Sequence, residues 1–292
     1  MKQHYHNICI VGAGRVGTAL AVALHKRGHR ICAVISHTRR SAQKLSRLVG
    51  SPLTSYSIRS MPVDCDVAII AVPDGQIKIV AREIARLKRK SFASLLVVHT
   101  SGIHTAEILS PLAKKGAHTA SIHPIQTFPA KAYRADLTNG IFYGIDASGK
   151  SVSEAKKLVA ALGGNAIVVP RDLKPLYHSL CVFSSGHLVA VLDAVAGLAK
   201  KFKFKKSWQE VLGPLILTAV RNAFHESPSD ALTGPIARGD IATVRAHLAS
   251  LRKRSPELVA LYRTLGLHEA EMAVKRRAMT RKTFGQMKRL LA

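Results

Sequence analysis

Acidic side chains are scarce in this sequence. Asp and Glu together number 17, against 44 Lys and Arg, which gives a formal net charge of +27 over 292 residues. The excess is spread evenly, with +14 in residues 1–150 and +13 in residues 151–292, although Lys200–Lys206 and Lys275–Arg289 form local basic runs. An even distribution is typical of a solvated basic surface that attracts anionic ligands. We therefore expect a small anionic metabolite as partner, and not nucleic acid.

Cysteine and long apolar segments are also scarce. Cys9, Cys32, Cys65 and Cys181 are scattered along the chain and form no CxxC pair. This spacing indicates free thiols in a reducing compartment, not a disulfide framework or a metal site. Apolar runs such as Val67–Val72 are too short to cross a bilayer, and the N-terminus shows no signal-peptide pattern. We expect a cytoplasmic protein with no bound metal and no membrane partner.

The order of apolar and amphipathic segments changes near residue 170. Before it, short apolar runs alternate with helical stretches, which predicts a parallel sheet with crossover helices. After it, the sequence predicts helices alone. Strands are expected at 7–11, 30–35, 66–72, 95–99, 119–122, 141–145 and 166–169, and helices at 16–27, 41–49, 76–88, 105–115, 153–162, 173–199, 207–225, 240–252, 256–265 and 267–290, the last of which could be interrupted. The expected fold class is α/β, with a doubly wound Rossmann domain at 1–170 and an all-helical substrate and dimerisation domain at 171–292.

Three glycines follow the first expected strand in the pattern G-x-G-x-x-G. Gly12 allows a tight turn, Gly14 lets the backbone approach a pyrophosphate, and Gly17 lets the following helix pack closely on the strand. The start of that helix offers unpaired N–H groups to phosphates. Strand, glycine turn and helix together indicate a dinucleotide site, whereas glycines alone would indicate only a turn.

The end of the second expected strand bears on the choice between NAD and NADP. An NAD site places a carboxylate there for the ribose 2′-hydroxyl, but this chain has Ser36-His37-Thr38-Arg39-Arg40 and no acid before Asp64. Hydroxyl and guanidinium groups suit a 2′-phosphate, so we expect NADP more than NAD. The residues expected to bind the cofactor are Gly12, Ala13, Gly14, Arg15, Val16, Gly17, Ser36, His37, Arg39, Arg40, Val72, Pro73 and Thr100.

Polar side chains follow the later strands, at the edge of the sheet where ligands bind in this architecture. Ser101 is a candidate donor to a substrate oxygen, and His123 and Gln126 are candidates to orient the substrate. Each is equally well explained as a loop or capping residue.

The start of the helical region carries a second set of candidates. Lys174 and His178 are spaced i, i+4 and share one face of a helix, with Asp172 as its expected N-cap and Pro175 in its first turn. A lysine there could supply the proton that accompanies hydride transfer, although the spacing alone favours a surface lysine.

A later loop, residues 231–240, is rich in turn-forming residues. Thr233 and Arg238 are candidates for binding the substrate, Arg238 through a carboxylate or phosphate, and Asp240 is expected to cap the next helix.

Taken together, the segments Val11–Gly17, Ala71–Asp74, His99–Gly102, His123–Phe128, Lys174–His178 and Ala231–Asp240 resemble the 6-phosphogluconate-dehydrogenase-like superfamily. That superfamily includes pyrroline-5-carboxylate reductase, ketopantoate reductase, β-hydroxyacid dehydrogenases and prephenate dehydrogenase. The chain is most similar to a branch in which a Rossmann-like domain precedes a helical domain of unknown function. The resemblance implies a homodimer formed through the helical domain, which the apolar stretch Leu180–Ala199 would suit.

The resemblance also implies site residues. Lys174 stands where relatives with a K-x-x-x-N motif keep a catalytic lysine, His178 replaces the Asn, and Thr233–Arg238 lies near the active site. One departure is Gly186-His187, where an Asn is expected after Phe183-Ser184-Ser185.

We therefore expect an NADP-dependent oxidoreductase that acts on a small anionic carbonyl, imine or hydroxy acid. Lys174, His178 and Ser101 are the expected catalytic residues. Three alternatives stay open: a nucleotide-binding sensor or scaffold without turnover, a prephenate-type dehydrogenase, and nucleic-acid association through the basic tail.

Overall fold

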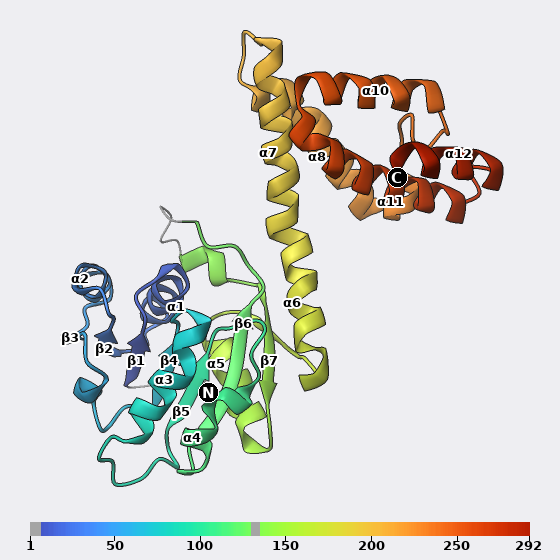
Figure 1. Cartoon of the computed structure of the whole chain (residues 1–292). Coiled ribbons are helices and arrows are strands. Elements are labelled where there is room, and N and C mark those ends of the chain that lie inside the picture. The colour runs from blue at the N-terminus through green and yellow to red at the C-terminus, as the bar shows by residue number, and fades with distance from the viewer. Residues whose placement is uncertain (1–6, 130–134) are drawn as a thin grey trace. The chain divides into compact units, whose positions relative to one another are not determined.

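The computed structural model describes residues 7–129 and 135–292 (Figure 1). The chain divides into two compact units between Gly186 and His187. The change from strands to helices falls near residue 170, as expected, whereas the division into compact units lies later, inside a continuous helical segment that spans Arg171–Phe202.

The first unit is built on an eight-stranded sheet with the order β3-β2-β1-β4-β5-β6-β7-β8. Neighbouring strands are parallel except for β6 and β7, which are antiparallel. The first six strands follow the order of a doubly wound dinucleotide-binding sheet, which confirms the predicted fold class. The strands are β1 (Ile8–Val11), β2 (Ile31–Ile35), β3 (Leu53–Ser55), β4 (Val67–Ile70), β5 (Leu96–His99), β6 (His118–Pro124), β7 (Phe142–Ala147) and β8 (Asn165–Val168).

Two layers of helices cover this sheet. Helices α1 (Arg15–Lys26), α2 (Arg39–Val49) and α5 (Lys150–Ala161) pack on one face, and α3 (Asp74–Ala85) and α4 (Ser110–Ala113) pack on the other. Both interfaces consist of fully buried aliphatic side chains, because strands covered on both faces need apolar residues at every position. Three of the four cysteines are buried in the second interface, as predicted for free thiols.

The sequence prediction was wrong at two places in this unit. Leu53–Ser55, expected in a loop, is an edge strand paired only with β2; three residues are too few to show an alternating pattern. The helix expected at 105–115 is a 3₁₀ turn, Ala106–Leu109, followed by the single turn of α4. Pro111 at the start of α4 has no backbone N–H to continue a helix from the preceding turn.

The helical segment after β8 begins with a 3₁₀ turn, Arg171–Leu173, and continues as α6 (Lys174–Val182), a π-helical turn (Phe183–His187) and α7 (Leu188–Ala199). Leu173, not Asp172, is the N-cap of α6, so the predicted capping role of Asp172 is wrong. The 3₁₀ turn places Asp172 one residue too early to cap α6. Pro175 does lie in the first turn of α6, as predicted.

The second unit contains α7 and five further helices: α8 (Trp208–His225), α9 (Pro228–Ala231), α10 (Ile241–Arg254), α11 (Val259–Lys275) and α12 (Arg281–Leu291). Asp240 caps α10 by accepting from the Thr243 N–H at 3.0 Å, as predicted. The predicted break near Gly266 is wrong, because α11 runs through this glycine. A side chain at Gly266 would meet Ile236 and Leu291, so the glycine serves close packing. The break comes at 276–280, where Arg277 has a left-handed φ of 60°.

Helices α7 and α8 carry large apolar side chains that nothing in the described chain covers. Examples are Leu188 and Val189 on α7, and Leu215, Leu217 and Phe224 on α8. By length and composition, the segment Arg171–Phe202 could cross a membrane, which corrects the expectation that every apolar segment is too short. One such helix is weak evidence, since core helices of soluble proteins pass the same test.

The basic run Lys200–Lys206 follows this segment and includes two aromatic residues. Phe202 and Phe204 are stacked with ring centroids 5.6 Å apart, and they are 67% and 38% exposed. Exposed aromatics among lysines are a feature of surfaces that bind single-stranded nucleic acid, so nucleic-acid association stays an open alternative.

Candidate active site

The glycine turn between β1 and α1 has the geometry that a dinucleotide site requires. Gly12 has φ +106°, and a Cβ there would lie 2.3 Å from the Ala71 carbonyl oxygen. A Cβ at Gly17 would lie 2.0 Å from the Gly12 carbonyl oxygen. By contrast, a Cβ at Gly14 would meet nothing within 4 Å, and no side chain caps α1. The turn is therefore closely packed on its inner side and open at Gly14, where a phosphate would approach the first N–H groups of α1.

The neighbouring strand ends bring further cofactor candidates to this turn. The Gly12 N–H donates to Ile35 O, the Ala71 N–H to Val11 O, and the Thr100 N–H to Ile70 O. Val72 lies against Gly12. Beyond β2, Ser36 is half-buried, while His37, Arg39 and Arg40 are exposed at the start of α2. These residues fit a dinucleotide, with Gly12–Gly17 holding the pyrophosphate and Ser36–Arg40 available to the ribose and any 2′-phosphate.

Lys174 is fully buried at the start of α6. Its Nζ donates to Ser121 Oγ on β6 at 2.6 Å, and Ser121 in turn donates to the carbonyl oxygen of Ser101 at 3.1 Å. Burial lowers the pKa of Lys174 to about 8, and the nearby Asp146 carboxylate opposes this change. A lysine with a pKa near neutrality can both give and take a proton at physiological pH.

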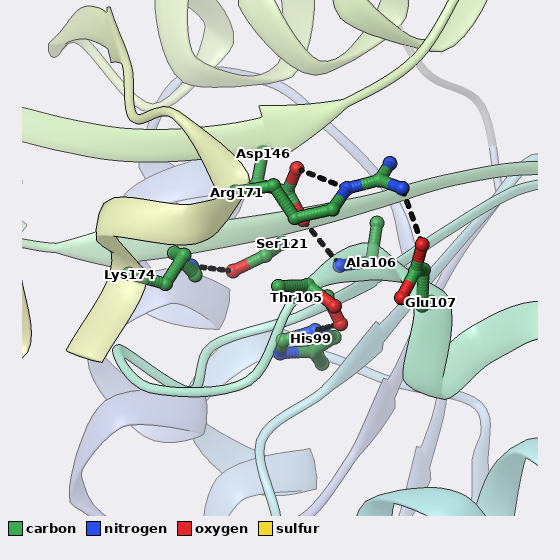
Figure 2. Close-up of polar contacts among 8 residues, drawn as sticks. All are labelled: His99, Thr105, Ala106, Glu107, Ser121, Asp146, Arg171 and Lys174. Atoms are coloured by element: carbon green, nitrogen blue, oxygen red, sulfur yellow. Dashed lines mark hydrogen bonds and ion pairs between the residues drawn. The ribbon is translucent and has the colours of Figure 1, made fainter.

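Asp146 lies opposite Ser121 in the antiparallel pair of β6 and β7. Figure 2 shows that its carboxylate does not reach Lys174 but accepts from the Ala106 N–H, and lies 3.6 Å from Nε of Arg171. Arg171 also pairs with Glu107. Asp146 is therefore balanced by other groups, which leaves Lys174 with a neutral serine as its direct partner.

His99 ends β5 and is also fully buried. The Ser101 N–H donates to His99 Nδ1 at 3.2 Å, so Nδ1 carries no proton and Nε2 donates to Thr105 O at 3.1 Å. Burial lowers the pKa of His99 to about 4, so the ring is neutral at pH 7. These bonds hold the loop from His99 to Thr105 in place, and Ser101 Oγ is engaged by the His104 N–H.

A cavity of about 240 Å³ lies between the end of β6 and the helical segment that begins with α6. Its polar lining residues are His123, Gln126, Thr127, His178, Ser184 and Ser185. The Ser184 and Ser185 hydroxyls donate to the carbonyls of Leu180 and Cys181, at 2.9 and 2.6 Å. Their lone pairs therefore remain available to an N–H or O–H group of a ligand. The two serines belong to the π-helical turn Phe183–His187, and such turns often occur at functional sites.

The structure thus brings most of the predicted site residues of the first unit to one edge of the sheet. His123 and Gln126, the predicted substrate contacts, line the cavity together with His178, a predicted catalytic residue, whereas Lys174 is enclosed and does not line it. Thr233 and Arg238 belong to the second unit, in the segment between α9 and α10. Their role in substrate binding stays a prediction.

A larger hollow of about 600 Å³ lies elsewhere, between the Ile58–Met61 segment and the end of α3. It is bordered by exposed Arg59, Arg86 and Lys88, and none of the predicted site residues lines it.

Sequence reasoning missed Ser121, Asp146 and Tyr177. Ser121 bonds Lys174, Asp146 affects its pKa, and the Tyr177 hydroxyl lies 2.7 Å from His123 Nδ1. Tyr177 could have been found from its position between Lys174 and His178 on α6. The other two could not, because their role depends on how β6 and β7 pair.

Comparisons with known proteins agree with this architecture. Residues 1–124 match the model of the Rossmann-like domain, and residues 141–269 match the domain of unknown function DUF2520. The two matches follow each other along the chain, a Rossmann-like domain and then DUF2520. This is the organisation that the predicted resemblance to a branch of the 6-phosphogluconate-dehydrogenase-like superfamily implies.

Several solved structures share the fold over nearly the whole chain. A protein of Bacteroides fragilis, provisionally assigned as an NADP oxidoreductase, is 25% identical with a TM-score of 0.79, over 91% of this chain and 98% of its own. A protein of Thermotoga maritima is 24% identical with a TM-score of 0.68, over 92% and 99%. A pyrroline-5-carboxylate reductase of Coxiella burnetii is 17% identical with a TM-score of 0.58, over 95% and 100%. No protein of curated function matches the sequence.

Proposed function

We propose that the protein is an NADP-dependent oxidoreductase that acts on a small anionic carbonyl, imine or hydroxy acid. The observation that carries this proposal is that one edge of a doubly wound sheet holds both a dinucleotide turn, open at Gly14, and a buried lysine with a pKa near 8. The resemblance to the Bacteroides fragilis protein supports the same class of reaction.

A bound nicotinamide cofactor would supply or accept the hydride. The protein's own part is to hold the substrate and to move one proton. We assign the proton to Lys174, with Ser101 and His178 assisting and Arg238 binding the anionic group of the substrate. Lys174 is enclosed in this structure, so its side chain would deliver the proton only after rotating toward the cavity.

The cavity supports a substrate with two kinds of polar group. Ser184 and Ser185 offer lone pairs to an iminium N–H or a hydroxyl group, while His123 and Gln126 face the same space. Imines and hydroxy acids meet this description, and the volume of about 240 Å³ suits a small metabolite.

Cofactor binding can be tested without knowing the substrate. Calorimetric titration with NADPH and NADH should show tighter binding of NADPH, and Gly14→Val should weaken both, because its side chain would fill the open phosphate site. Gly213→Val on α8 is the matched control, since a Cβ there also meets nothing within 4 Å. Equal affinity of wild type and G14V for NADPH would exclude this turn as the cofactor site.

The preference for NADP is tested separately on α2. Arg39→Ala and Arg40→Ala should each weaken NADPH binding by about 10-fold or more, as expected for a charge-assisted hydrogen bond, and leave NADH binding unchanged. Arg47→Ala, at the other end of the same helix, should change neither. If R39A and R40A weaken NADH and NADPH alike, the two arginines do not recognise the 2′-phosphate.

A screen of carbonyl acids, imines and hydroxy acids then tests turnover. Once a substrate is found, Lys174→Ala should abolish most activity, and unchanged turnover would refute the acid/base assignment. The enclosure of Lys174 favours one alternative, a protein that binds NADP without turnover. Tight NADPH binding with no oxidation across the whole panel would support that alternative. A prephenate-type dehydrogenase would be recognised in the same screen by its substrate.

We further propose that a second copy of this chain covers the apolar side chains of α7 and α8. Exposed residues such as Leu215 and Leu217 form a patch of the kind that marks protein interfaces. A bilayer is a poorer partner, because α7 carries Asp193, and a carboxylate near the centre of a membrane costs about 3 kcal/mol. A cytoplasmic location is part of the same proposal.

A further inference from the structure

His123 and Tyr177 form a close pair at the wall of the cavity. The Tyr177 hydroxyl oxygen lies 2.7 Å from Nδ1 of His123, and the two rings meet edge to face with centroids 5.6 Å apart. His123 ends β6, and Tyr177 lies on α6 between Lys174 and His178. The pair therefore connects the sheet to the helix that carries Lys174 and His178, two of the three predicted catalytic residues.

The bond between them could run in either direction, and two observations favour Tyr177 as the donor. The separation of 2.7 Å is usual for an O–H donor and short for an N–H donor. If Nδ1–H donated instead, the hydroxyl proton would be left to the Cys181 thiol, because the other polar neighbour, the backbone of Gly144, lowers the Tyr177 pKa and so acts as a donor. Sulfur is a weak acceptor, so the imidazole nitrogen is the better partner for the hydroxyl proton.

Both groups are neutral at physiological pH. Burial, the positive charge of Lys174 and the neighbouring His178 together lower the pKa of His123 to about 4. Burial likewise raises the pKa of Tyr177. A neutral imidazole carries a single ring proton, and when Nδ1 accepts from Tyr177 that proton is on Nε2.

Nε2 faces the side of the ring that Tyr177 does not occupy. A Cβ at Gly102 would lie 2.4 Å from Cδ2 of His178 and 3.0 Å from Nε2 of His123, so Gly102 keeps the space between these two rings free of a side chain. Within residues 7–129 and 135–292, the hydrogen bond of the His123 ring is made through Nδ1 alone. His123 lines the cavity, and its Nε2–H is the ring hydrogen that remains for a ligand there.

We propose that Tyr177 is a positioning residue that fixes the proton of His123 on Nε2 and thereby directs a neutral N–H donor toward an oxygen atom of the substrate. A neutral imidazole can polarise a carbonyl group without an ion in the site. The positive charge of Lys174 then adds to burial in favouring the neutral ring, and Lys174 acts as the proton source. This assignment rests on the proposed function for the identity of the ligand, but the position of the proton does not depend on it.

The position of the proton can be measured directly by NMR. Long-range ¹H–¹⁵N spectra of the ¹⁵N-labelled full-length protein at pH 7.5 distinguish protonated from unprotonated ring nitrogens, and His123→Gln assigns the signal. The wild type should show Nε2 protonated and Nδ1 unprotonated. Tyr177→Phe should shift the Nδ1 signal and populate both tautomers, because the ring loses the donor that selects between them.

The chain offers a matched control in its second unit. Tyr262 and His247 form a similar pair, with the hydroxyl 2.9 Å from Nδ1 and the rings also edge to face, but His247 is exposed and lines no cavity among those described. Tyr262→Phe should alter the signal of His247 and leave that of His123 unchanged. It therefore controls for the loss of a tyrosine hydroxyl as such.

A protonated Nδ1 in the wild type would overturn the proposal, whatever the variants do. The proposal is equally wrong if Y177F folds, as judged by circular dichroism, and leaves both His123 nitrogen signals unchanged. If Y177F does not fold, Gly144→Ala replaces it, since a Cβ there would lie 2.3 Å from the Tyr177 hydroxyl oxygen and displace it. G144A should shift the Nδ1 signal in the same direction, and an unchanged signal would count against the proposal.

Kinetics provide a second readout when a substrate is known. His123→Gln should lower kcat by about 100-fold, in the range for loss of a donor to a developing oxyanion, and Y177F should lower kcat by about 10-fold with a smaller change in KM. An unchanged kcat in Y177F would show that the tautomer has no catalytic role. The correct tautomer without any turnover would instead refute the proposed function and leave the role of Tyr177 in place.

Discussion

Replacing Lys174 by methionine should make the protein more stable at neutral pH, although it removes the proposed acid/base. Lys174 is fully buried, and among the described residues its ammonium group donates to one acceptor, Ser121 Oγ, at 2.6 Å. Its pKa of about 8, against 10.5 for an exposed lysine, means that burying the charged form costs about 3 kcal/mol. Methionine has a similar length and no charge, and the lost hydrogen bond offsets about 1 kcal/mol of the gain. We expect a net increase of about 2 kcal/mol at pH 7.

The gain should depend on pH in a defined direction. Between pH 8 and pH 10.5 the unfolded chain holds a proton on Lys174 that the folded protein has lost, so the stability of the wild type rises with pH across this window. K174M lacks this contribution. The difference in unfolding free energy between the two proteins should therefore be largest below pH 8 and disappear, or change sign, near pH 10.5.

Urea unfolding at several pH values measures this difference. The single tryptophan, Trp208, lies in the second unit, so its fluorescence follows that unit, and far-ultraviolet circular dichroism follows both. Lys157→Met is the control, because that lysine is exposed and pairs with Glu154 at 2.8 Å; its effect should stay within about 1 kcal/mol. A difference between wild type and K174M that is constant from pH 7 to pH 10.5 would show that the pKa of Lys174 is not lowered by burial.

Two further predictions concern the second unit. Gly266→Val should destabilise it by about 1–3 kcal/mol, because the added atoms would overlap Ile236 and Leu291. Trp208 fluorescence during urea unfolding measures this loss of stability. Gly197→Val is the control, because a Cβ at Gly197 meets nothing within 4 Å. For the proposed second copy, size-exclusion chromatography with light scattering should give a dimer for the wild type and a monomer for Leu217→Glu, whose leucine is 71% exposed. A monomeric wild type at micromolar concentration would refute the dimer.

The sequence was sufficient to predict most of the strands and helices in order, and the tight glycine turn after β1. Strands β1, β2, β4 and β5 are buried on both faces and read as continuous apolar runs, which are easy to find. The Gly12–Gly17 turn has a fixed spacing because its three glycines meet separate steric needs. The short edge strand β3 lacked both kinds of signal.

Glycine outside a motif was harder to interpret. At Gly266 the sequence suggested the end of a helix, but the residue is small because Ile236 and Leu291 pack against it. The actual break near Arg277 has no glycine at the left-handed position, so the usual signal for a helix end was absent.

The candidate site was predicted only in part, for a related reason. The spacing of Lys174 and His178 places them on one helix face. It does not predict that Lys174 is buried or that it bonds Ser121. That bond depends on the packing of α6 against β6, two elements that are far apart in the sequence. The pairing of Ser121 with Asp146 depends on β7 running against the direction of the other strands.

Strand β7 also affects the site through the absence of a side chain at Gly144. Gly144 lies opposite His123 in the sheet, and the hydroxyl group of Tyr177 occupies the space where a methyl group at residue 144 would be. The size of one residue thus controls where a neighbouring ring carries its hydrogen atom, without touching that ring. In a relative of this protein, an alanine at the same place would be expected to change the chemical state of the histidine while every polar residue around it stayed the same.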